Sequence, residues 1–215
     1  MRFLLENPDT VAAARAAQAA GLDGVLLAEL QAPLVTAAAL AGQVDDVLVA
    51  TEVPLGDRHP LELAEEAIVT DLTLGGRLIL VVRPAAAHGE RFDEAFHLLH
   101  LCLTPRSFRF EGRYWKVPAN LPQNVWLPEE EIVVMPSPPR ARLEVWPSSA
   151  LARERFTGSS SLVERLRESR PEWVAVTAPV EAARELGSIV RPRVQMQRLS
   201  PGLEEFWDAE RPWAR

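Results

Sequence analysis

The sequence predicts an α/β fold, an incomplete TIM-type (β/α) barrel of six or seven parallel strands. Two observations predict it. Four units of a strand followed by a helix succeed one another between Met1 and Thr104, and this order is typical of a parallel sheet with right-handed crossovers. A complete barrel of eight such units takes about 250 residues. This chain has 215 residues and gives residues 107–140 to an insertion, so one or two strands should be missing.

The first two units are marked by their caps and apolar runs. Met1–Glu6 has the alternation of a strand, and Asn7–Asp9 supplies a cap and a first-turn proline for a helix that ends at Gly21. The apolar run Gly24–Glu29 predicts the second strand, because parallel strands are covered on both faces. The following helix, Pro33–Gln43, is apolar almost all round. Both of its sides should therefore be buried, one of them against another subunit.

The next two units follow the same rhythm. Asp46–Val53 predicts the third strand and Arg77–Val82 the fourth. Between them, His59–Gly75 predicts a helix that opens on a proline and ends at a glycine able to adopt the left-handed conformation. Glu90–Thr104 is the clearest amphipathic helix of the chain, because its apolar residues recur at helical spacing.

The alternation of strands and helices stops in the insertion, residues 107–140. Phe108–Val117 predicts a β-hairpin about a Glu-Gly turn, and repeated prolines then keep the chain extended. After the insertion, the expected elements are a strand, a helix, a strand and a helix, at Leu143–Trp146, Ser161–Glu168, Trp173–Thr177 and Pro179–Val190. Residues 198–215 form a tail without an assigned element, and the whole chain is expected to be one domain.

The composition excludes several classes of partner. The 30 acidic and 23 basic side chains give a formal net charge of −7, which would repel the backbone of a nucleic acid. No apolar run approaches the roughly 18 residues needed to cross a membrane. The chain does not start with the pattern of an export signal, which predicts a cytoplasmic protein. Cys102, the single cysteine, falls on the apolar face of a predicted helix and should be buried.

Three segments carry a resemblance to a known family. Arg58–Val82 (RHPLELAEEAIVTDLTLGGRLILVV) resembles the most recognisable segment of the luciferase-like flavin monooxygenases, where a His-Pro opens a helix that ends in Leu-Ser-Gly-Gly-Arg before strand four. Glu90–Ala95 is similar to the family's fourth helix, and Phe110–Tyr114 is similar to its Phe-Glu-Gly-Arg-Tyr hairpin. The order and the spacing of the three segments also agree.

The resemblance implies a function and a partner. Members of the family are β/α barrels, usually dimers, that bind reduced FMN or the deazaflavin F420 and use it to activate oxygen or to move hydride. It therefore implies a flavin-dependent oxidoreductase or monooxygenase. It also implies a homodimer, or a heterodimer with a related chain, that forms through the helices Pro33–Gln43 and His59–Gly75.

The resemblance also implies a cofactor-binding site. Arg83 follows the fourth strand, one residue from where some relatives place an arginine on the FMN phosphate. A guanidinium suits phosphate because it donates two parallel hydrogen bonds. Ser148 and Ser149 follow the fifth strand and are similar to a serine turn that binds the same phosphate in relatives. For the two serines, an ordinary helix cap is the alternative.

Other features depart from the family's pattern. The family's glycine-rich turn after strand four is replaced by Val82–Ala85, and the loss of glycine hinders close approach of the backbone to a flavin ring. The histidine-bearing loop after strand two is missing too, because Glu29 leads almost directly into the next helix. No histidine can be moved to that position, so the catalytic residues are unknown, and no spacing of residues suggests a metal site.

Three hypotheses remain open from the sequence. The chain could be a flavin-dependent oxidoreductase, for instance one chain of a dimeric enzyme with an impaired site. It could be a non-catalytic subunit that binds flavin. It could also be a structural pseudoenzyme that binds no cofactor.

Overall fold

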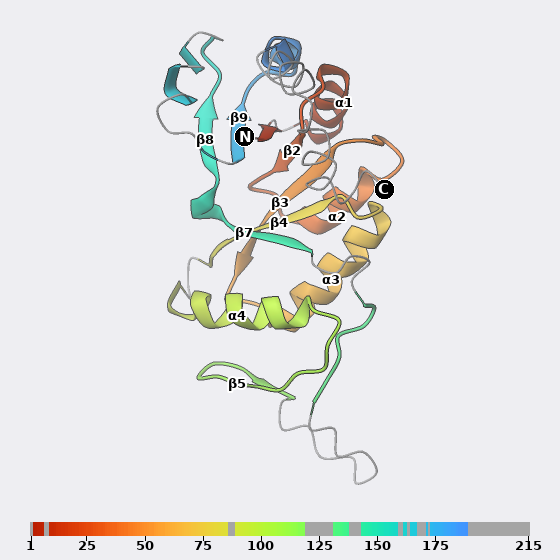
Figure 1. The fold of residues 1–215 in the computed structure, drawn as a ribbon, viewed down its shortest axis with the longest axis vertical. Coiled ribbons are helices and arrows are strands. Elements are labelled where there is room, and N and C mark those ends of the chain that lie inside the picture. The colour runs from red at the N-terminus through yellow and green to blue at the C-terminus, as the bar shows by residue number, and fades with distance from the viewer. Residues whose placement is uncertain are drawn as a thin grey trace, which may run out of the picture.

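A computed structural model describes residues 2–6, 9–85, 89–118, 131–137, 143–158, 161–162, 164–166, 171 and 173–188. Within these residues, seven strands form one wholly parallel sheet in the order β7-β4-β3-β2-β1-β9-β8. Their bounds are β1 Arg2–Glu6, β2 Gly24–Leu27, β3 Leu48–Leu55, β4 Leu78–Pro84, β7 Glu144–Pro147, β8 Ala152–Arg155 and β9 Trp173–Thr177. The sheet is curled (Figure 1), and the predicted incomplete barrel of parallel strands is confirmed.

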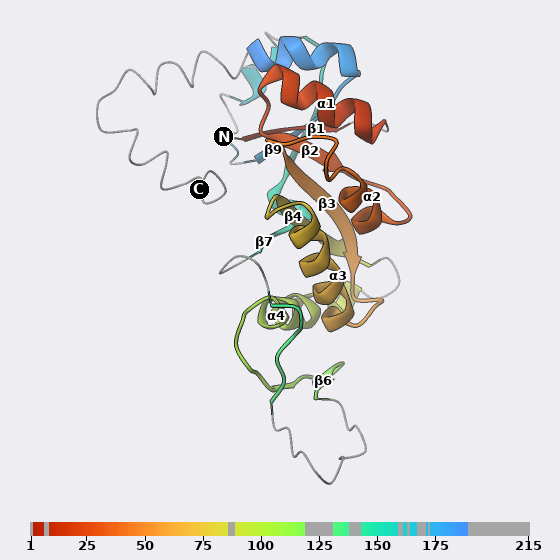
Figure 2. The same ribbon diagram turned by 90° about the vertical axis from the view of Figure 1, so that its right-hand side faces the viewer.

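Helices cover the outer face of this sheet, and α1, α2 and α3 lie side by side along it in Figure 2. The α-helices are α1 Thr10–Ala20, α2 Pro33–Ala39, α3 Pro60–Thr73 and α4 Phe92–Cys102. The 3-10 turns are η1 Gly89–Arg91, η2 Ser148–Ala150 and η3 Val180–Ala182, and residues 183–188 are helical. Among the described helices, none is both long and apolar enough to span a membrane.

The predicted helix boundaries have physical causes. The Asp9 side chain caps α1 by accepting a hydrogen bond from the Ala12 amide at 3.0 Å, and Gly21 ends the helix in the left-handed conformation. Within this chain one side of the second helix is buried, and burial of its other side against another subunit stays a prediction. In α2, Leu34 and Ala37 are buried, but Val35 is 72% exposed.

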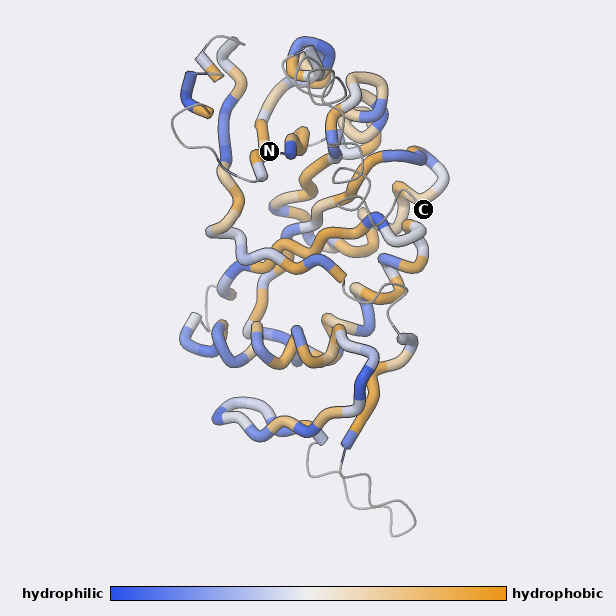
Figure 3. The backbone as a smooth tube through the Cα atoms, viewed as in Figure 1, coloured by the Kyte–Doolittle hydropathy of each residue, from blue (hydrophilic) through white to orange (hydrophobic). Residues whose placement is uncertain are grey.

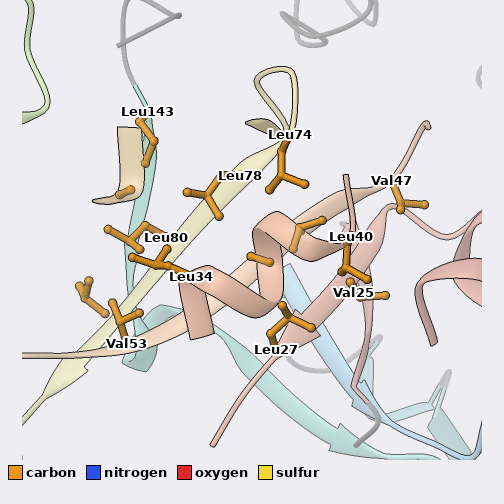
Figure 4. Packing of buried hydrophobic residues seen from close by; sticks show 14 of the residues in the cluster. Val25, Leu27, Leu34, Leu40, Val47, Val53, Leu74, Leu78, Leu80 and Leu143 are labelled. Carbon is orange, nitrogen blue, oxygen red and sulfur yellow. The ribbon is translucent and has the colours of Figure 1, made fainter. Parts of the chain in front are cut away.

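The alternation of side chains along each strand creates two apolar cores. On the outer face, Val25, Leu27 and Val53 pack beneath Leu34 and Leu40 (Figure 4). The inner-face core holds Leu4, Leu26, Leu48, Ala50, Ile79, Val81, Leu151, Trp173 and Ala175. Because successive side chains of a strand point to opposite faces, both sides of the sheet are apolar. The hydrophobic colour of Figure 3 accordingly follows the strands.

The insertion folds beyond α4, on the side away from the sheet (Figure 1). The predicted hairpin is confirmed, with β5 Phe110–Glu111 antiparallel to β6 Lys116–Val117. Glu94 of α4 anchors it, since its carboxylate accepts three backbone hydrogen bonds, at 2.8–3.0 Å, from residues 113–115. Parts of the predicted proline-rich segment (119–130 and 138–142) and the predicted tail 198–215 lie outside the described residues.

Strand β8 is absent from the sequence prediction. It follows β7 directly, through η2 and Leu151, with no helix between the two strands. Yet β7 and β8 stand at opposite edges of the sheet. A chain spans at most about 3.6 Å per residue, so the short connection brings the two edges close together. The sheet is therefore curled far enough for groups on distant strands to meet inside it.

Candidate site at the carboxyl ends of the strands

Polar side chains replace the apolar series of the inner face at the carboxyl ends of the strands. On each strand, the residue two places after an inner-face apolar residue points the same way. By this alternation Glu6 follows Leu4, Glu52 follows Ala50, Arg83 follows Val81, Arg153 follows Leu151 and Thr177 follows Ala175. Carboxyl ends of parallel strands meet at one end of a barrel, where ligands generally bind.

The three residues predicted to bind a cofactor lie together at this end, and we call them the phosphate site. Val82 of β4 is paired with Pro147 of β7. Arg83 is the next residue of β4, and Ser148 is the first residue of η2 directly after β7, so the two stand at about the same level of the barrel. Arg83 and Ser149 are exposed and Ser148 is half-buried. Both serines lie in η2, and their role as ligands remains a prediction.

The guanidinium of Arg83 makes no hydrogen bond or ion pair with any residue in the described part of the chain. It therefore has its full set of donors to offer to a ligand. This distinguishes Arg83 from Arg153, which lies at the same end of the barrel.

Four residues that the sequence analysis missed form an ion cluster beside the phosphate site. We call Glu6, Glu52, Arg153 and Thr177 the mouth cluster. Arg153 contacts Glu52 at 2.9 Å and Glu6 at 3.2 Å. The Thr177 hydroxyl donates a hydrogen bond of 3.0 Å to the second carboxylate oxygen of Glu6. A glutamate within the apolar strand Asp46–Val53 was the one signal in the sequence that could have revealed it.

The interior below the mouth cluster is filled by apolar and aromatic side chains. Trp146 and Trp173 meet edge to face, with their ring centroids 6.0 Å apart. Beneath them, the Arg2 guanidinium lies 4.6 Å from the Trp173 ring and 3.6 Å from the Glu144 carboxylate. A cavity of about 10 Å³ remains, lined by Leu4, Ile79, Val81, Trp146, Leu151 and Trp173. Ligand pockets commonly measure about 300–1,000 Å³, so a sizeable ligand must bind at the rim.

The described histidines have contacts outside the phosphate site and the mouth cluster. His59 caps α3, and its Nδ1 atom accepts a hydrogen bond from the Leu61 amide at 3.2 Å. His97 and His100 belong to α4, where they meet phenylalanine rings edge to face. Cys102 is buried as predicted, and burial raises the pKa of its thiol to about 12.

Among the described residues, no group of three or more histidine, cysteine, aspartate or glutamate side chains is arranged to hold a metal ion.

Comparison with known proteins gives a consistent result. A sequence model of the family described as "Luciferase-like monooxygenase" matches residues 6–139. No curated protein matches the chain significantly. Among solved structures, the fold is similar to EDTA monooxygenase from Chelativorans sp. BNC1, with a TM-score of 0.57 and 15% identity over 87% of this chain and 58% of that one.

Two further similar structures contain flavin compounds according to their descriptions. One is the oxygenating constituent of 3,6-diketocamphane monooxygenase from Pseudomonas putida in complex with FMN (TM-score 0.51, 17% identity, 88% of this chain and 62% of that one). The other is a riboflavin lyase with modified FMN and riboflavin (TM-score 0.53, 13% identity, 78% and 57%). At such identities the likeness concerns the fold, and this chain spans less than two thirds of each of these structures.

Proposed function

The chain belongs to the luciferase-like monooxygenase family, and we propose that it binds the phosphate of a flavin cofactor, FMN or F420, at the phosphate site. One observation carries this proposal. Arg83 of β4 and Ser148 of η2 directly follow Val82 and Pro147, which are paired on adjacent strands, at the end of the barrel where ligands collect. A guanidinium that is unpaired among the described residues, beside two hydroxyl groups, offers several hydrogen-bond donors to a phosphate.

The residues present fit the phosphate end of such a cofactor better than its ring. The backbone after β4 runs Val82-Arg83-Pro84-Ala85, with no glycine to allow a ring to lie against it. The polar side chains of the mouth cluster bind one another rather than facing a free space. Flavins supply redox chemistry in this family, and the part that this chain's own residues support is the holding of the phosphate.

We propose further that the chain acts within a dimer, as one chain of an oxidoreductase with an impaired site. The exposed apolar side chains of α2 and α3 support a partner: Val35 is 72% exposed, Val69 51% and Leu72 45%. The two helices pack against each other, and burying such side chains on association is favourable. The partner would be a second copy or a related chain.

A second candidate is a subunit that binds the cofactor without catalysis. The mouth cluster favours it, because Arg153 and the two carboxylates pair with one another at the mouth.

Titration of FMN with the purified chain tests the proposal. We expect the fluorescence of FMN to be quenched, and we expect Arg83→Ala to weaken binding at least about tenfold, since hydrogen bonds to charged groups contribute about 1.5–3 kcal/mol. Arg109→Ala is the matched control, because Arg109 is an exposed arginine of the hairpin region beyond α4. An Arg83→Ala protein that binds FMN as tightly as the control would remove Arg83 from the site.

Product formation from reduced flavin and oxygen distinguishes the two candidates. Turnover by the dimer supports an oxidoreductase, whereas tight binding without turnover supports the non-catalytic subunit.

A further inference from the structure

The mouth cluster joins strands that are far apart in the sheet. Arg153 belongs to β8 and Glu52 to β3, and three strands stand between them in the sheet order. Neighbouring strands are about 4.8 Å apart, so four such steps along the sheet would measure about 19 Å. The observed contact of 2.9 Å therefore crosses the interior of the barrel. Arg153, Glu6 and Glu52 therefore form a row of ion-paired side chains across the mouth, which we call the bar.

This bar leaves few polar groups at its level for recognition of a flavin ring. A ring is oriented by hydrogen bonds to the donors and acceptors on its edges. Arg153 is bound to Glu6 and Glu52, and Thr177 is bound to Glu6. Two carboxylates and one guanidinium also carry a net charge of −1, which repels a ring that becomes an anion on reduction. Beneath the bar the interior is apolar and nearly filled.

Arg83, at the edge of the mouth, differs from the bar in two ways: it carries a positive charge, and it has no partner among the described residues. Arg83 follows Val81 on the inner face of β4, one inner-face position beyond the level of Glu52, because Glu52 is paired with Val81. Its guanidinium is exposed and unpaired among the described residues. The strongest free donor that the structure places at this end is therefore suited to a phosphate, and it lies above the bar.

We propose that this site selects ligands by their phosphate group and leaves the attached ring in solvent, with Arg153, Glu6 and Glu52 as the residues that exclude the ring. The inference rests on the proposed phosphate site and narrows its ligand class. Ligands with a phosphate monoester and different bodies should bind with similar affinity. Riboflavin, which has the ring of FMN without its phosphate, should bind poorly.

A series of three ligands tests this on the wild-type chain by isothermal titration calorimetry: FMN, riboflavin and glycerol 3-phosphate. We expect FMN and glycerol 3-phosphate to have dissociation constants within about tenfold of each other, and riboflavin to bind at least about tenfold more weakly than FMN. Riboflavin that binds as tightly as FMN would overturn the inference. So would glycerol 3-phosphate that fails to displace FMN at a hundredfold excess.

The outcomes separate this inference from the proposed function. If FMN and glycerol 3-phosphate both fail to bind, the phosphate site itself is wrong and the inference falls with it. If glycerol 3-phosphate binds and FMN does not, selection by phosphate stands and the flavin assignment is wrong. If FMN and riboflavin bind equally well, flavin binding stands and selection by phosphate is wrong.

A double variant tests the role of the bar. Glu52→Gln combined with Arg153→Gln removes both ion pairs of Arg153, with Glu52 and with Glu6, while the net charge of the three side chains stays at −1 and both new side chains can form hydrogen bonds. We expect the ratio of the riboflavin and FMN dissociation constants to fall, with the affinity for glycerol 3-phosphate unchanged. A merely structural role would weaken all three ligands together. If the variant does not fold, as judged by circular dichroism, the ligand series on the wild-type chain still decides the inference.

Discussion

The Nη2 atom of Arg153 lies 2.9 Å from a carboxylate oxygen of Glu52, across the interior of the barrel. The side chain of Glu52 is only 7% exposed, whereas that of Arg153 is 38% exposed. Removing one partner of a buried ion pair costs about 3–5 kcal/mol, because the other charge is left uncompensated. Exposure of the guanidinium lowers this figure through solvent screening.

We therefore expect Arg153→Met to lower the free energy of unfolding by about 2 kcal/mol, measured by urea denaturation. Arg155→Met is the matched control, since Arg155 is an exposed arginine two residues later on β8. Its side chain has no partner among the described residues, so its removal should change stability by less than about 0.5 kcal/mol. Equal stability of the two variants would contradict a stabilising role for the Arg153–Glu52 pair.

The same pair shows why part of the fold could be predicted and part could not. β2 and β4 are continuous apolar runs, and such runs are typical of parallel strands buried on both faces. The sequence of β8 is Ala-Arg-Glu-Arg. Because three of its four residues are charged, it lacks the hydrophobic pattern by which a strand is predicted. Two of these charges have partners outside the strand, Glu52 and Glu6 for Arg153 and Arg165 for Glu154. Tertiary contacts decide such a strand.

The candidate site likewise has one part that the sequence predicts and one part that it does not. Arg83, Ser148 and Ser149 could be found from the sequence because they follow strands whose positions a family resemblance fixes. The mouth cluster depends on the curl of the sheet, which brings β8 to β3. No spacing along the chain encodes that meeting.

Glu94 is expected to hold the hairpin in place. Burial opposes its ionisation, but the hydrogen bonds from the backbone amides of Trp115, Tyr114 and Arg113 outweigh that effect and lower the pKa of the carboxyl. Glu94→Gln removes the charge and one strong acceptor, so we expect a loss of roughly 1 kcal/mol. Faster hydrogen exchange at the Trp115 amide would report it. Asp93→Asn is the control, because Asp93 is the exposed neighbouring acid on α4.

The lowered pKa of Glu94 also predicts the direction in which acid changes the stability of the hairpin region. A carboxyl whose pKa is lower in the folded state stabilises the fold above its unfolded value of 4.5, and this contribution is lost as the pH falls through the folded value. Protection of the Trp115 amide should therefore decline below pH 4.5 in the wild type. Glu94→Gln should lack this dependence, and an identical decline in both proteins would assign it to another group.

His59 is expected to make stability sensitive to a milder fall in pH. Burial lowers the pKa of its imidazole, and the nearby Glu62 only partly offsets that effect. The unfolded chain then takes up a proton first, so stability should fall as the pH drops below 6.5 and level off below the folded value. Protonation also removes the Nδ1 acceptor that caps α3.

Asparagine keeps a capping acceptor but does not titrate, which makes His59→Asn the informative change. We expect the free energy of unfolding of the wild type to decrease more between pH 7 and pH 5.5 than that of His59→Asn, in parallel urea titrations. Because every other histidine is common to both proteins, their contributions cancel in the difference. Equal pH dependence would show that His59 is not the responsible group.

The proposed dimer predicts a specific response to charge on α3. Val69 is 51% exposed on this helix, and an aspartate there would place a charge in an apolar interface. A charge buried without a partner costs several kcal/mol, so Val69→Asp should weaken association at least about a hundredfold. Sedimentation velocity over a concentration series measures it. Val11→Asp, which charges an exposed valine of α1, serves as the control. If Val11→Asp dissociates the dimer and Val69→Asp does not, the interface does not include α3. A charge at position 69 would then stay in solvent in the dimer and would not be buried between the two chains.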